Sequence, residues 1–578
     1  MSLTEYRKKF NKYVWGMGLE HEMHLFHLKK NRKSNISSFT LYNGELARNR
    51  VLDEINLKDN IDVTDKDFEL LSNVPFEKTG RLCNGKWVIK KVPFNMPEFI
   101  TSMPITKIRL SGKDKSRTIK GLCEELIQQK NHFINLLKKD PITKKQIKKY
   151  GELYQYPFGM TSYLKYPESS NALTYQFAKD SKGKTKVREE YVGSYHITIT
   201  LPYIQNKTTQ KEFIEMHQNF ANQLQWLEPL LLTSFFSCDE KAPGSKYDRV
   251  RGSFRVAIIG WGNFAGSDVR KLGEGIGRYS DIDSYWRKGL KLHGINKLKP
   301  CFKPSAYAKK EGGISTLSSN FRTFGDNENG ERISGAGMTV GNGVEFRIFD
   351  QFNDEHLDDL VKFCALVAEN SRKHKTTKYV YKNKKWINAL QDIMKEGWCA
   401  KLKKGYVNDL RKMLGLKIKT ESLIAYDVLN VINDELYDKH KNGDFFVMMN
   451  SYEWFLQKSS KKNDYDSLKP VLPLINFDSW VMGCMIKLNR NKKLLEKFNS
   501  LLNVLPDYFD VKTFEKTFFN LFNKKSWCKD VNNFIHMLFK FDYIDVTYNN
   551  DGTVKECKVL SRKTVKNFNK DIKNFFFK

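Results

Sequence analysis

Gly18-Leu19-Glu20-His21-Glu22 lies in a predicted β-strand that spans residues 18–28. Side chains two residues apart in a strand share a face, so Glu20 and Glu22 are expected to project together. Two neighbouring carboxylates repel each other, and burying them is costly unless a cation lies between them. This pair of glutamates therefore predicts a metal site.

The same two-residue period recurs in two later predicted strands. Glu345 and Arg347 share a face in residues 343–349, whose apolar residues pack behind them. His196 and Thr198 share a face in the predicted strand 194–202, whose alternate apolar residues lie on the other face. One sheet lined by all three polar pairs would form an acidic floor rich in oxygen ligands. Such ligands suit Mg²⁺ or Mn²⁺.

Each polar pair taken alone also fits the solvated face of an ordinary antiparallel sheet. The conjunction of three such strands favours a shared site over that interpretation. Glu98 adds a further carboxylate to the predicted β-segment 86–102, in an apolar stretch that runs into Met103 and Pro104. A helix is predicted for residues 118–138, and a long apolar helix for residues 210–238.

The order of these motifs resembles that of the glutamine synthetase-like carboxylate–amine ligases, with glutamate-cysteine ligases and amidoligases as the most similar members. The resemblance rests on Gly-Leu-Glu-His-Glu, the Glu98 strand ending in Ser-Met-Pro, the His196 strand and Val-Glu-Phe-Arg at 344–347. Residues 277–285, Gly-Arg-Tyr-Ser-Asp-Ile-Asp-Ser-Tyr, resemble a stretch of eukaryotic-type glutamate-cysteine ligases. The similarity covers about residues 14–372.

The resemblance implies an α+β fold in which a curved antiparallel sheet forms a funnel, flanked by helices, that holds ATP and divalent ions. By carry-over, the metal ligands would be Glu20, Glu22, Glu98, His196 and Glu345. The nucleotide would be contacted by Arg347, Arg322, His196 and Thr198. The substrate carboxylate would be bound by Arg278 and Tyr279, and the catalytic residues would be Arg347, Glu345 and Arg278. The family often has two spaced acidic residues in its second strand region, where this chain has Glu98.

The implied reaction joins a glutamate-like carboxylate to an amine. ATP, with Mg²⁺ or Mn²⁺, would convert the carboxylate to an acyl phosphate, which the amine then attacks. Whether the amine belongs to a small molecule, a peptide or a protein stays open at this point. A catalytically degenerate descendant of the same fold, serving as a basic structural or nucleic-acid-associated protein, is the alternative.

The bulk composition fits a globular protein of two or three domains. The chain has 578 residues and a formal charge of +32, which makes an anionic partner plausible. Residues 376–578 contribute 37 basic and 23 acidic residues, net +14, so the excess extends over both halves of the chain. Nine scattered cysteines suggest neither a zinc module nor a disulfide framework. Without an apolar leader or a long apolar run, the chain is expected to be cytoplasmic and not membrane-bound.

A change of character near residue 375 predicts a boundary between a catalytic domain, 1–375, and a mainly helical, basic region, 376–578. Helices are expected at 421–441 and 511–541, and a hairpin at 543–560 around Asn549-Asn550-Asp551-Gly552. A helix followed by a basic hairpin is compatible with a winged-helix element that binds nucleic acid. A purely structural hairpin is the default interpretation.

Two other chemistries are less consistent with the sequence. A zinc site is suggested by His21, Glu22, His24 and His27, but their spacing is not that of H-E-x-x-H. The glycines of residues 260–266 do not follow G-x-G-x-x-G, and no βαβ pattern follows them, which disfavours a dinucleotide fold. These glycines are better explained as a loop near the nucleotide.

Overall fold

The computed structural model describes principally residues 13–27, 102–111, 118–139, 194–204, 210–238, 344–350, 352–378, 383–457, 468–489, 491–522 and 530–562, with short pieces elsewhere. Predictions for other residues, including the glycine-rich loop 260–266, lie outside this part of the chain. No helix among the described residues is both long and apolar enough to cross a membrane.

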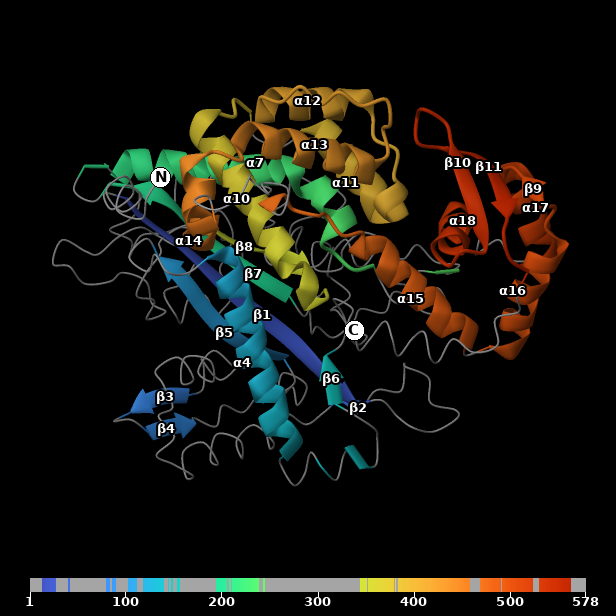
Figure 1. Cartoon of the computed structure of the whole chain (residues 1–578), viewed down its shortest axis with the longest axis horizontal. Coiled ribbons are helices and arrows are strands. Elements are labelled where there is room, and N and C mark those ends of the chain that lie inside the picture. Colours follow the sequence, from blue (N-terminus) through green and yellow to red (C-terminus); the bar gives the residue numbers. More distant parts are fainter. Residues whose placement is uncertain are drawn as a thin grey trace, which may run out of the picture.

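The N-terminal half contains a six-stranded sheet in which every pairing is antiparallel. The long strand β1 lies in its centre, between β5 and β7, and β8 pairs with the far side of β7 (Figure 1). Two short strands, β2 and β6, pair with the last residues of β1. The bounds are β1 Val14–His27, β2 Thr40–Leu41, β5 Ser102–Ser111, β6 Leu153–Gln155, β7 Ser194–Tyr203 and β8 Val344–Asp350. A separate hairpin joins β3 (Gly80–Cys83) to β4 (Lys86–Ile89).

One face of this sheet is buried against helices. Alternate residues of β1 and β7 are removed from solvent in a core shared with α4 (Ile119–Lys139), α7 (Gln210–Ser234) and α10 (Leu357–Lys373). These strand residues are Trp15, Met17, Leu19, Tyr195, Ile197 and Ile199. The alternation is that of a half-buried strand, because successive side chains point to opposite faces. The helices therefore cover the face opposite to the alternate polar positions.

Helix α7 contains Pro229, which has no N–H to donate to the carbonyl of Gln225 one turn earlier. The indole Nε1 of Trp386, on α11 (Lys384–Glu396), donates to that carbonyl oxygen at 2.8 Å. Next to it, the hydroxyl of Tyr406 donates to the carbonyl of Trp226 at 2.6 Å. Burial raises the pKa of Tyr406 well above its usual value. The proline is thus tolerated in the buried part of the helix, residues 220–234, because a side chain from another helix replaces the missing donor.

This compensation predicts a coupling between Pro229 and Trp386. Trp386→Phe is expected to lower the free energy of unfolding by about 2 kcal/mol, because it leaves a buried carbonyl without a donor. In a Pro229→Ala background, the restored N–H of residue 229 supplies that donor, so the same change should cost about 1 kcal/mol less. A double-mutant cycle by urea unfolding measures the difference. Strict additivity of the two changes would contradict this account of how α7 accommodates Pro229.

The next helices continue the same core across residue 375. They are α11, α12 (Lys404–Leu414), α13 (Ala425–His440) and α14 (Asp444–Gln457). The core cluster that begins at Trp15 extends without a break to Ile475. Packing therefore does not separate the chain at the predicted boundary, since the helices that follow it complete the burial of α7 and α10.

A second cluster forms the C-terminal unit, residues 491–562, with α15 (Ile475–Asn489) lying between it and the first core (Figure 1). The order along the chain is helix, strand, helix, helix, strand, strand. The elements are α16 Lys492–Val504, β9 Tyr508–Phe509, α17 Val511–Phe522, α18 Val531–Lys540, β10 Ile544–Tyr548 and β11 Val554–Val559. The sheet order is β10-β11-β9, all antiparallel. This is the arrangement of a winged helix, with the β10–β11 hairpin as the wing.

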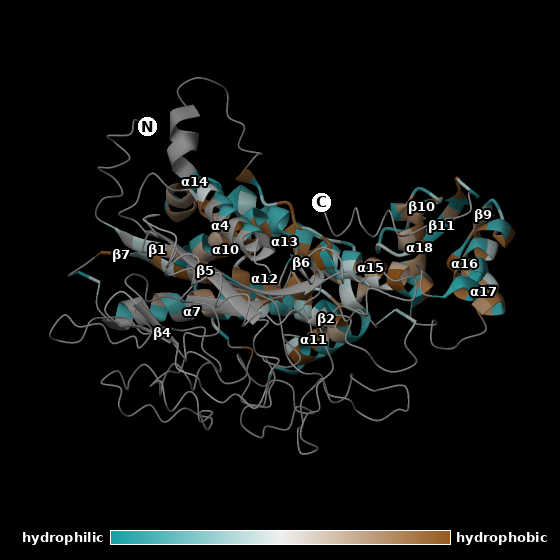
Figure 2. Cartoon of the chain, turned by 90° about the horizontal axis from the view of Figure 1, so that it is seen from below, coloured by the Kyte–Doolittle hydropathy of each residue, from teal (hydrophilic) through white to brown (hydrophobic). Residues whose placement is uncertain are grey.

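The amphipathic helices of this unit show as alternating hydrophilic and hydrophobic patches in Figure 2. The predicted hairpin at 543–560 is confirmed, and Gly552 in its turn has a φ of 78°. The single helix predicted for 511–541 is wrong: α17 ends at Phe522 and α18 begins at Val531. Of the predicted β-segment 86–102, residues 86–89 form β4 and Ser102 begins β5, and the residues between them lie outside the described part of the chain. The funnel shape of the sheet stays a prediction.

Candidate functional site

Three adjacent strands bring the predicted polar pairs to neighbouring register positions. Glu20 of β1 lies directly opposite His196 of β7, and Glu22 lies opposite Ser194. On the other side of β7, Thr198 lies opposite Glu345 of β8. These pairings place segments from the beginning, middle and later part of residues 1–375 in adjacent strands of one sheet.

A β-bulge in β8 occurs beside His196. Tyr195 pairs with Phe349 and Ile197 pairs with Phe346, so Arg347 and Ile348 together face the single residue between them. Bulges are common next to active sites, because they bend a strand locally and change the direction of its residues. Arg347, the predicted phosphate-binding residue, is therefore located in the one irregular step of this strand pair.

The histidine of the Gly-Leu-Glu-His-Glu motif belongs to the core side of the sheet. His21 is buried, and its ring stacks on Tyr195 of the neighbouring strand with 4.0 Å between centroids. The Tyr195 hydroxyl donates to the carboxylate of Asp354, in the turn η6 (Asp354–His356) that follows β8. The Tyr195 ring also lies 4.4 Å from that of Phe352. These contacts connect β1 and β7 with the segment that follows β8, on the core side of the sheet. By the alternation of the strand, His21 belongs to the face opposite to that of positions 20 and 22.

The short turn η6 is only partly buried. Burial lowers the pKa of His356, and the nearby carboxylate of Glu355 opposes that shift. Burial also raises the pKa of Asp359, on the first turn of α10, although this carboxylate accepts a hydrogen bond from the backbone N–H of Val471 at 2.8 Å. This hydrogen bond joins the start of α10, just after the turn, to the segment that precedes α15.

The remaining predicted site residues are not placed. Glu98, Arg278, Tyr279 and Arg322 lie outside the described residues. The strand positions at Glu20, Glu22, His196, Thr198, Glu345 and Arg347 are described by their backbone alone. Among the side chains that are described, no three His, Cys, Asp or Glu residues are arranged to hold a metal ion. The metal ligand set stays a prediction.

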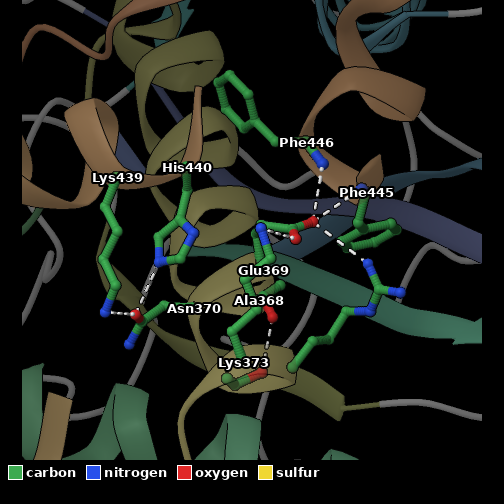
Figure 3. Close-up of polar contacts among 10 residues, drawn as sticks. Ala368, Glu369, Asn370, Lys373, Lys439, His440, Phe445 and Phe446 are labelled. Atoms are coloured by element: carbon green, nitrogen blue, oxygen red, sulfur yellow. Dashed lines mark hydrogen bonds and ion pairs between the residues drawn. The ribbon is translucent and has the colours of Figure 1, made fainter. Parts of the chain in front are cut away.

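A second polar cluster, which the sequence did not reveal, lies between α10, α13 and α14 (Figure 3). Glu369 is fully buried and forms ion pairs with Lys373 at 3.0 Å and Arg372 at 3.3 Å. Its Oε2 also accepts the backbone N–H groups of Phe445 at 2.8 Å and Phe446 at 3.4 Å. These are the second and third residues of helix α14, the donors that a helix N-cap side chain normally satisfies.

The N-cap position of α14 is Gly443, which has no side chain to accept those donors. A Cβ atom at residue 443 would lie 2.4 Å from Cγ of Glu369. The carboxylate from α10 thus caps α14 from a distance of 76 residues along the chain. The signal in the sequence is a glycine where an N-cap side chain is expected, but it does not identify which residue replaces it. This cluster is best explained as structural.

Beside this cap, His440 is buried, and its Nε2 lies 2.8 Å from Oδ1 of Asn370. Burial, followed by the charges of Lys373 and Lys439, lowers the pKa of His440 to about 4. Burial alone lowers the pKa of His536, on α18, to about 4 as well. Both imidazoles are therefore neutral in the folded protein at neutral pH.

These two histidines predict a loss of stability in mild acid. Below about pH 6.5 the unfolded chain takes up protons that the folded chain does not bind, so the free energy of unfolding falls until about pH 4. Each histidine is expected to lower the free energy of unfolding by up to about 3 kcal/mol as the pH falls from about 6.5 to about 4, and to have no such effect above that range. Urea unfolding as a function of pH should show a smaller slope for His440→Gln than for the wild-type chain. An identical slope would contradict the assignment of a depressed pKa to His440.

The comparisons with known proteins add a distant relative. No family model matches the chain. The uncharacterized protein R704 of Acanthamoeba polyphaga mimivirus is 22% identical over 340 residues, which cover 56% of this chain and 51% of that protein. The chain thus spans about half the length of the relative it matches. The relative's name assigns no activity.

Proposed function

We propose that the chain is an ATP-dependent carboxylate–amine ligase whose site is formed by β1, β7 and β8. The observation that supports this proposal is the register of the three strands, in which Glu20 lies opposite His196 and Thr198 lies opposite Glu345. These four positions come from segments that long insertions separate, and the register places them in adjacent strands. Helices cover the opposite face of the sheet, so the proposal assigns the substrate to the polar face.

The donor types in these rows fit a divalent ion and a phosphate chain. Carboxylates at residues 20, 22 and 345 supply the oxygen ligands that Mg²⁺ and Mn²⁺ prefer, and His196 adds a nitrogen that Mn²⁺ accepts. Bound Mg²⁺ would offset the negative charge of the ATP phosphates. Glu20, Glu22, His196 and Glu345 would hold it, with Glu98 as a further candidate from outside the described residues.

The chain's own residues would then position the reactants. The guanidinium of Arg347 would stabilise negative charge on the phosphoryl group as it moves to the substrate carboxylate. Arg278 and Tyr279 would bind that carboxylate, with Arg322 and Thr198 on the nucleotide. Transfer releases ADP and leaves an acyl phosphate, and attack by the amine then releases phosphate and forms the amide.

Phosphate release from ATP across a panel of amino acids and amines tests this function. The proposal expects release that needs a carboxylate, an amine and Mg²⁺ or Mn²⁺ together, and it expects Mg-ATP to raise the thermal midpoint. Release from ATP that is independent of both co-substrates would contradict a ligase. Stabilisation by nucleic acid but not by Mg-ATP would instead support the non-catalytic alternative.

A further inference from the structure

The winged-helix unit does not offer its usual nucleic-acid face. In helix-turn-helix proteins the second helix of the motif enters the major groove. Here the equivalent helix, α18, packs on α15 and on the turn at 397–399. Its Phe534 ring lies 5.3 Å from Trp480, its His536 ring lies 4.6 Å from Trp398, and Lys540 forms an ion pair with Asp478.

The wing is also in contact with the rest of the chain. Asp551 in its turn forms a 3.0 Å ion pair with Lys401, and a Cβ atom at Gly552 would lie 2.6 Å from Oγ of Ser422. The charge of the unit is only slightly positive. Residues 491–562 include 12 Lys and Arg and nine Asp and Glu, a net charge of +3 in 72 residues. The geometry of this unit does not favour binding to a polyanion, and its charge density is well below that of the helical segment 372–419.

The basic excess of the C-terminal half is concentrated elsewhere. Residues 372–419 contain 15 Lys and Arg against three Asp and Glu, a net charge of +12 in 48 residues. Residues 420–578 contain 25 against 20, a net charge of only +5. Residues 372–419 comprise the end of α10, helices α11 and α12, and the segments that connect and follow them.

Packing gathers many of these cations at one edge of the molecule. Lys385 of α11 pairs with Asp409 of α12 at 3.0 Å, which fixes the start of α11 beside α12. Thr376 donates to the carbonyl of Met413 at 3.0 Å, which holds the segment 374–378 against the end of α12. We define the α11–α12 edge as the exposed cations Lys375, Lys378, Lys384, Lys385, Lys404, Arg411 and Lys412. Among the described residues, only Lys385 of this set forms an ion pair.

Helix stability does not explain these positions. Cations at a helix C-terminus, such as Arg411 and Lys412, interact favourably with the helix dipole. Lys384 and Lys385 begin α11, however, and Lys404 begins α12, where the dipole disfavours positive charge. Neither first turn contains an acidic residue. Positive charge is thus placed where it costs local stability, which indicates another use for it.

We propose that the α11–α12 edge binds the phosphate backbone of double-stranded nucleic acid without reading its sequence. The described residues with large exposed apolar side chains are Val471, Val504, Tyr508, Phe539, Tyr548 and Leu560, and all lie outside 372–419. Among the described side chains of residues 372–419 there is therefore no exposed aromatic platform on which unpaired bases could stack, and Tyr379 and Tyr381 lie outside the described residues. The same described side chains form no exposed apolar face with which a basic helix inserts into a membrane surface. What the edge offers is a set of exposed cations on two packed helices and the segment beside them, which suits the phosphate backbone of a duplex.

The test uses the full chain and a short mixed-sequence DNA duplex. The edge variant carries Lys375→Gln, Lys384→Gln, Arg411→Gln and Lys412→Gln. The control variant removes four exposed cations of the winged-helix unit, with Lys492→Gln, Lys493→Gln, Lys497→Gln and Lys512→Gln. Thermal midpoints and circular dichroism establish that both variants are folded. Affinity is measured by fluorescence anisotropy over a range of salt concentrations.

The edge variant is expected to bind at least about tenfold more weakly than wild type, with the slope of log affinity against log salt reduced by about 3. The control variant should retain the wild-type affinity and slope. Equal losses in both variants would overturn the proposal, because the binding would then reflect net charge alone. Absence of duplex binding by the wild-type chain would overturn it too. The proposal would also be overturned if the wild-type chain bound phosphatidylserine vesicles but not DNA, and if the edge variant weakened that vesicle binding.

Discussion

Replacing Glu20 or Arg347 by alanine is expected to reduce carboxylate- and amine-dependent phosphate release by a factor of about 10² to 10³, the range found when one preorganised electrostatic contact to a transition state is removed. Glu20 lies opposite His196 in the sheet, and Arg347 lies in the bulge opposite that same histidine. In the proposed site, Glu20 holds the divalent ion and Arg347 contacts the transferred phosphoryl group. Loss of either leaves charge on the moving phosphoryl group uncompensated.

Matched controls distinguish this effect from a general change in charge. Glu124→Ala on α4 and Lys492→Ala on α16 remove an exposed carboxylate and an exposed cation remote from the three site strands. Both should release phosphate at the wild-type rate. A steady-state assay with saturating ATP measures all four variants. If Glu20→Ala and Arg347→Ala were as active as their controls, neither residue would belong to the site.

The second large effect concerns stability. Glu369→Ala is expected to lower the free energy of unfolding by about 3 kcal/mol. The substitution removes the acceptor for two backbone N–H groups at the start of α14 and the partner of Lys373 and Arg372. The cap cannot be replaced locally, because residue 443 is glycine. Urea unfolding followed by circular dichroism measures the change.

Two further variants show which part of the carboxylate matters. Glu369→Gln keeps an oxygen acceptor near the two N–H groups but loses the charge, so its cost should lie between that of Glu369→Ala and zero. Glu421→Ala, at an exposed position, should change stability by less than about 0.5 kcal/mol. A loss for Glu369→Ala no larger than that for Glu421→Ala would show that the buried carboxylate does not cap α14.

The strands could be predicted from the sequence because their side chains alternate. In β7, buried Tyr195, Ile197 and Ile199 occupy every second position, as the apolar pattern indicated. The same alternation predicted β8 at 343–349, and the structure has it at Val344–Asp350. What alternation does not provide is the pairing between strands. That Glu20 and His196 are cross-strand neighbours depends on register, which long-range packing determines.

Other features were missed because they depend on contacts between distant segments. Residues 511–541 have a continuous apolar periodicity, but the chain folds them as α17 and α18 with a break between. The buried charge of Glu369 is hidden in sequence, where Glu369 resembles any surface residue of an amphipathic helix. The α11–α12 edge depends on Lys375 and Lys384 lying near Arg411 and Lys412, which helix packing brings about.

Binding of Mn²⁺ in the presence of ATP tests the central claim most directly, with free Mn²⁺ monitored by electron paramagnetic resonance. The wild-type chain is predicted to deplete the free Mn²⁺ signal beyond what ATP alone removes. A Glu20→Ala/Glu345→Ala variant should lose most of that depletion, whereas Glu496→Ala/Glu556→Ala, at exposed positions in the C-terminal unit, should retain it. Equal depletion by all three proteins, or none by the wild type, would show that β1, β7 and β8 do not form a metal–nucleotide site.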